Sequence, residues 1–87
     1  MRKLNTTMFH TRYKKRNNIC GIKIAQFRQD AKPYMSQGKM AETLQLGGMD
    51  CDRHVIRRIE NGKRFITDIE LKIIAETLNV KVDFLLE

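Results

Sequence analysis

The sequence predicts an all-α domain of five helices, and three observations support this fold class. Apolar residues recur every three or four positions in several segments, which is the spacing of one helix face. These segments are bounded by capping residues, glycines or the single proline. Aromatic residues make up only 7% of the chain and tryptophan is absent, a composition that suits a small helical core better than a sandwich or a barrel.

Local signals delimit the first two helices. We expect the first from about Gly21 to Ala31, because Pro33 cannot continue a helix. The second begins at Ser36, a good N-cap, and ends at the glycine pair 47–48. Their inward-facing positions are Ile24, Phe27 and Ala31 in the first helix and Met40, Ala41 and Leu44 in the second.

The third helix combines an apolar stripe with a run of bases. It starts near Asp50 or Asp52, either of which can cap it, and runs to Asn61. Gly62 then supplies the left-handed residue that commonly follows a helix. The inner stripe consists of Val55, Ile56 and Ile59. Side chains between these positions therefore turn outward or sideways.

The fourth and fifth helices close the predicted core. Thr67 and Glu70 form a capping box, in which each side chain satisfies a backbone amide near the other residue. A short last helix begins at Val82. The inward-facing positions are Leu71, Ile74, Ala75 and Leu78 in the fourth helix and Leu85 and Leu86 in the last.

Positive charge is unevenly distributed along the chain. The net charge is +7, yet residues 1–20 hold six bases and no acid, whereas residues 65–87 hold five acids and two bases. We interpret residues 1–20 as a basic N-terminal arm and residues 21–87 as the folded domain. Such a footprint suits a polyanion, because a base that meets a phosphate releases condensed counterions. Solvated surface charge is the alternative interpretation.

Nothing in the sequence indicates catalysis, a cofactor or a metal. Cys20 and Cys51 lack a CxxC spacing, and a zinc site would need to combine Cys51 and His54 with ligands from the other end of the chain. No nucleophile, base and orienting group gather at a plausible spacing, so we expect no enzymatic activity. No segment approaches the roughly 20 apolar residues of a membrane span, and no signal-peptide pattern opens the chain. We therefore expect a cytoplasmic protein.

Three segments of the sequence resemble a known family. They are Met-Ser-Gln-Gly-Lys-Met-Ala-Glu-Thr-Leu from Met35, Ile-Arg-Arg-Ile-Glu-Asn-Gly-Lys-Arg from Ile56, and the stretch from Leu71 to Leu86. Together with the first helix they are similar, over residues 21–86, to the Cro/repressor (XRE-type) helix-turn-helix family. The resemblance implies a compact lambda-repressor-like domain that binds double-stranded DNA as a homodimer and regulates transcription, as a repressor in the simplest case.

The third helix carries the expected base contacts. An arginine fork meets guanine O6 and N7 together, and the major groove, about 12 Å wide, admits a helix. The resemblance places Arg53, His54 and Arg58 at base-reading positions. Arg57 is the further candidate, equally suited to a phosphate. The alternative for His54 is a neutral surface imidazole without a functional role.

Two other groups of residues are expected around this helix. The candidates for phosphate contacts are Ser36, Gln37 and Lys39 at the start of the second helix and Asn61, Lys63 and Arg64 after the third. Backbone amides at a helix start favour an anion, although Ser36 serves equally as a cap. The resemblance implies that the loop after the third helix lies along the sugar-phosphate backbone of the DNA. The resemblance also implies an ion pair between Arg28 and Glu60.

The sequence departs from the family pattern between Leu44 and Ile56, where the connection is longer than usual. The third helix could therefore meet a groove at an altered angle. Met35, Met40 and Met49 are expected to fill the core. Phe84, Leu85 and Leu86 are candidates for a dimer contact or for closing the core.

A different function remains open: an antitoxin or another interaction module, whose DNA binding is secondary to binding a protein partner.

Overall fold

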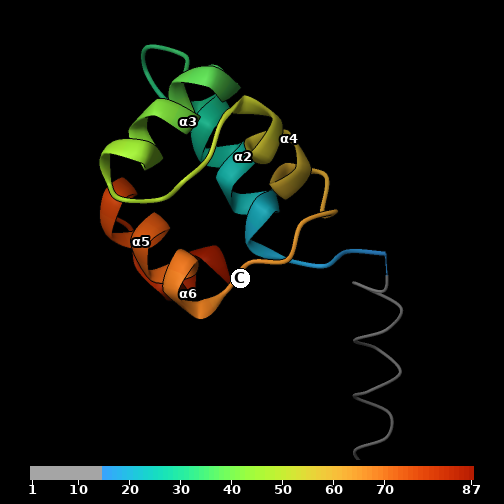
Figure 1. Cartoon of the computed structure of the whole chain (residues 1–87). Helices are drawn as coiled ribbons and strands as arrows, with labels where there is room; N and C mark the ends of the chain where they lie inside the picture. Colours follow the sequence, from blue (N-terminus) through green and yellow to red (C-terminus); the bar gives the residue numbers. More distant parts are fainter. Residues whose placement is uncertain (1–14) are drawn as a thin grey trace, which may run out of the picture.

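The computed structural model describes residues 15–87, and this part of the chain contains five α-helices and no strand (Figure 1). The helices are α2 (Cys20–Asp30), α3 (Gln37–Leu46), α4 (Arg53–Glu60), α5 (Asp68–Leu78) and α6 (Val82–Leu85). The predicted all-α class and the five helices are confirmed. Residues 1–14, which include most of the predicted arm, lie outside the described residues.

Side-chain caps fix where three of the helices begin. The Ser36 hydroxyl accepts a hydrogen bond from the Lys39 amide at 3.0 Å, and the Asp52 carboxylate accepts one from the Val55 amide at 3.0 Å. Asp52, rather than Asp50, is therefore the cap of α4. At the start of α5 both halves of the predicted capping box with Thr67 are present, each at 3.1 Å.

All five helices contribute to one core. The largest fully buried side chains are Ile24, Met40, Leu44, Ile56, Ile59, Ile74 and Leu85. One expectation needs correction: Leu86 is 45% exposed and does not belong to the core, because it follows the last residue of α6. Leu85 is fully buried and closes the core, which is one of the two roles expected for it.

The long connection between α3 and α4 is held by two buried side chains. Met49 and Cys51 point into the core, and Gln45 Nε2 donates to the Cys51 carbonyl at 2.6 Å. Gly48 permits the reversal because its φ is 105°, a value that residues with a Cβ rarely adopt. The connection is thus an anchored turn, which fixes α4 against α3 despite its length.

Candidate nucleic-acid interface

Helix α4 presents four basic side chains on one exposed face. Arg53, His54, Arg57 and Arg58 are all exposed, whereas Ile56 and Ile59 on the other side have no exposed surface. At about 100° per residue, the four basic positions fall within an arc of about 140°. Within residues 15–87 none of the four lies within ion-pair distance of a carboxylate. The face is therefore free to meet an external anion.

Asp52 lies beside this face but is occupied as a helix cap. Its carboxylate accepts from the Val55 amide, and this hydrogen bond is the main reason why the pKa of Asp52 is lowered. The negative charge is stabilised by the N-terminal end of α4, where backbone amides are otherwise unsatisfied.

The start of α3 brings one expected phosphate-contacting residue into an internal contact. Gln37 Nε2 donates to Glu60 Oε1 at 3.0 Å, so this side chain joins α3 to α4 instead of standing free in solvent. Lys39 is exposed, and its ammonium is 3.9 Å from Glu42, a weak surface pair. Ser36 is exposed and acts as the cap of α3. Lys39 thus has the most freedom of the three to reach a phosphate.

The expected ion pair between Arg28 and Glu60 is present and buried. Arg28 Nε donates to Glu60 Oε2 at 2.8 Å, and Nη2 donates to Oε1 at 2.9 Å. The two side chains are only 7% and 8% exposed. These hydrogen bonds raise the pKa of Arg28 above its usual value. Arg28 Nη1 also donates to the Tyr34 hydroxyl and the Met35 carbonyl, so the pair ties α2, α4 and the segment before α3 together.

The three remaining candidates for phosphate contacts lie in the loop after α4, and they differ in exposure and in their partners. Asn61 and Lys63 are exposed. Arg64 is not free as expected, because its two terminal nitrogens donate to the Glu70 carboxylate at 3.2 and 3.1 Å. Chiefly for this reason, the pKa of Glu70 lies below its usual value. In this structure Arg64 ties the loop to α5.

Part of the predicted arm is attached to the folded domain. Residues 16–18 form hydrogen bonds with the end of α4 and the loop that follows it. The only sequence signal was a pair of asparagines ahead of the first helix, which resembles a capping signal. Asn18 Oδ1 accepts from the nearby Gly21 amide, but the side-chain donors of both asparagines bind carbonyls more than 40 positions away, beyond the reach of a local pattern.

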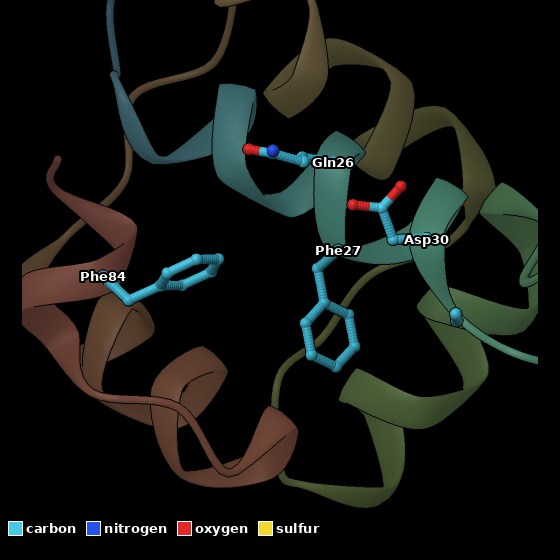
Figure 2. A pocket seen from close by; sticks show the side chains of 5 residues that line it. Gln26, Phe27, Asp30 and Phe84 are labelled. Carbon is cyan, nitrogen blue, oxygen red and sulfur yellow. The ribbon is translucent and has the colours of Figure 1, made fainter.

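A small pocket of about 280 Å³ opens between α2 and α6 (Figure 2). Phe84 points from α6 toward α2, and Phe27 lies beside it. The pocket is completed by Gln26, Asp30 and Ala31. None of its lining residues comes from α4, so it does not belong to the basic face. Phe84, a predicted candidate for a dimer contact, is partly buried here.

Neither cysteine has a disulfide partner. Cys20 and Cys51 are both buried, and burial raises the pKa of Cys20 to about 11. Among residues 15–87 no three side chains of His, Cys, Asp or Glu gather into a group that could hold a metal ion. No helix in this part of the chain has the length and apolar character needed to cross a membrane.

Comparison with protein-family models, with curated proteins and with solved structures gave no match.

Replacing Arg28 by alanine should lower the free energy of unfolding by about 3–5 kcal/mol, because it leaves the Glu60 carboxylate buried without its partner. Lys39→Ala is the control, since it removes an exposed pair that contributes about 0–1 kcal/mol. Urea unfolding of the two variants and the wild type measures both effects. Equal stability of Arg28→Ala and Lys39→Ala would contradict the role of the buried pair.

Glu70 should make stability depend on pH in the acid range. Its folded pKa lies below the usual 4.5, so the stabilisation is complete above that value and is lost as the pH falls through the folded pKa. Glu70→Gln retains a residue suited to the capping box and should flatten the decline of stability between about pH 5 and 3. Glu76→Gln, the same change at an exposed position of α5, is the control. An unchanged decline in Glu70→Gln would refute this prediction.

Proposed function

We propose that this protein binds double-stranded DNA sequence-specifically, with α4 in the major groove, and regulates transcription. The observation that carries the proposal is the exposed basic face of α4, anchored from behind by Ile56 and Ile59. Such a helix presents long hydrogen-bond donors on its exposed side, and the buried isoleucines on its other side fix its orientation. In this proposal α3 and α4 are the two helices of a lambda-repressor-like helix-turn-helix.

The residues divide by chemistry into those that specify sequence and those that position the domain. Arg53, His54 and Arg58 are the proposed base contacts, with Arg57 reaching either a base or a phosphate. Lys39 and Lys63 are the proposed principal phosphate contacts, because both are exposed and lie on the segments that flank α4. Ser36, Gln37 and Asn61 would add backbone or side-chain hydrogen bonds. Arg64 requires release from Glu70 to take part.

We further propose that the protein acts as a homodimer in the cytoplasm. Two copies of α4 would then meet successive major grooves, about 34 Å apart, on a roughly palindromic site. Leu86 is an exposed apolar residue available for such a contact.

Selection of bound sequences from a random duplex pool tests the proposal directly. The selected sites should share base preferences in two related half-sites, and their affinity should fall steeply as salt rises, because phosphate contacts release counterions. Fluorescence anisotropy across about 50–200 mM salt gives the slope. Absence of enrichment, or a flat response to salt, would exclude DNA binding of this kind.

Two alanine variants should separate base contacts from phosphate contacts. Arg53→Ala should relax preference at one base position by about 1–3 kcal/mol, because it removes a bidentate donor. Lys63→Ala should weaken binding to all sequences alike and reduce the salt slope by about one. Lys81→Ala, at an exposed position before α6, is the control for loss of charge. If Lys63→Ala changed sequence preference while Arg53→Ala did not, the two assignments would be reversed.

A further inference from the structure

Three consecutive residues, Arg16, Asn17 and Asn18, surround the end of α4 with hydrogen-bond donors; we refer to residues 16–18 as the clamp. Arg16 Nη2 donates to the carbonyls of Ile59 and Glu60, at 3.3 and 3.0 Å. The Asn17 backbone amide donates to the Gly62 carbonyl at 2.7 Å, and its side chain donates to the Lys63 carbonyl at 2.9 Å. Asn18 Nδ2 donates to the carbonyls of Ile59 and Arg64, at 3.1 and 2.7 Å.

These acceptors belong to the end of a helix and the loop that follows it. The last carbonyls of a helix lack partners within the helix, and its C-terminal end carries a partial negative charge. Arg16 brings a positive charge to that end. The clamp thereby satisfies the carbonyls of residues 59 and 60 at the end of α4 and of residues 62–64 in the loop that follows. This loop presents Asn61 and Lys63 to solvent.

The fit between the clamp and the loop is close. Gly62 has a φ of 78°, and a Cβ at this position would come within 2.9 Å of Arg16 Cγ. Gly21, at the start of α2, faces the Ile59 carbonyl so closely that a Cβ there would collide with it. Asn18 Oδ1 accepts from the Gly21 amide at 2.8 Å, so one side chain joins the start of α2 to the end of α4. Figure 1 shows the blue segment passing beside the loop that leaves α4.

We propose that the clamp residues are positioning residues for DNA binding: they hold the loop of residues 61–64 in the conformation in which Lys63 and Asn61 meet a phosphate. This inference rests on the proposed function. Arg16 acts through the loop and is not itself a phosphate ligand, because its Nε and Nη2 donate to the chain's own carbonyls and its side chain is partly buried.

A loop ordered before binding does not lose conformational freedom on binding. Disrupting the clamp should therefore weaken affinity for every duplex by about 2- to 10-fold. The salt slope should stay unchanged, because the number of phosphates neutralised is the same. This combination distinguishes a positioning residue from a phosphate ligand, whose removal lowers affinity and slope together.

The experiment compares three charge-matched variants, Arg16→Gln, Lys63→Gln and Lys81→Gln, by anisotropy on one duplex over a range of salt. Arg16→Gln should lose affinity at constant slope, Lys63→Gln should lose affinity and about one unit of slope, and Lys81→Gln should match the wild type. Asn17→Ala removes one exposed bond to the loop and gives a milder variant should Arg16→Gln not fold. A lower slope in Arg16→Gln, or wild-type affinity in both clamp variants, would overturn the inference.

Amide hydrogen exchange measured without DNA tests the clamp independently of the proposed DNA binding. The amides of Gly62 and Lys63 donate to carbonyls of α4 at 3.0 and 2.9 Å, so their exchange reports whether the loop is ordered. Both clamp variants should exchange faster at these amides, and unchanged exchange would overturn the clamp even if the wild type binds DNA. A wild type that binds no duplex would overturn the DNA-binding proposal, and the positioning role with it, whatever the exchange rates show.

Discussion

The buried ion pair between Arg28 and Glu60 is the constraint on which the orientation of α4 depends. Both side chains are almost fully enclosed, so separating them would leave a charge without water or a partner. Gln37 adds a third hydrogen bond from α3 to the same carboxylate. The end of α4 is thereby fixed to two neighbouring helices at one residue. This attachment helps to fix the orientation of α4 and therefore the direction in which its exposed side chains point.

The arginines among residues 15–87 have two distinct tasks. Arg16, Arg28 and Arg64 are turned inward, onto carbonyls or carboxylates of other segments. The basic side chains of α4 have no such partners among residues 15–87. Arginine suits the first task because its planar fork can donate to several acceptors at once. Net charge alone does not reveal this division, which decides how much of the basic surface is available to a ligand.

Features encoded locally could be predicted from the sequence, and those made by distant contacts could not. Ser36, Asp52 and the capping box at Thr67 act within one helical turn, so residue type and spacing predict these helix starts, with Asp50 as a second candidate for α4 until the structure identifies Asp52 as the cap. The exposed and buried sides of α4 followed from its periodicity in the same way. The contact of Asn18 with the end of α4 and the commitment of Arg64 to Glu70 depend on how segments pack, which no local pattern records.

The two buried thiols give the protein native chemical reporters. Cys20 begins α2 two residues after the clamp, and Cys51 precedes the cap of α4. A thiol reagent reaches neither side chain until the chain around it opens, and thiolate is the reactive form. Alkylation kinetics at each cysteine would therefore follow local opening at the two ends of the α4 region separately, without a foreign label and without any substitution in the surface that faces solvent.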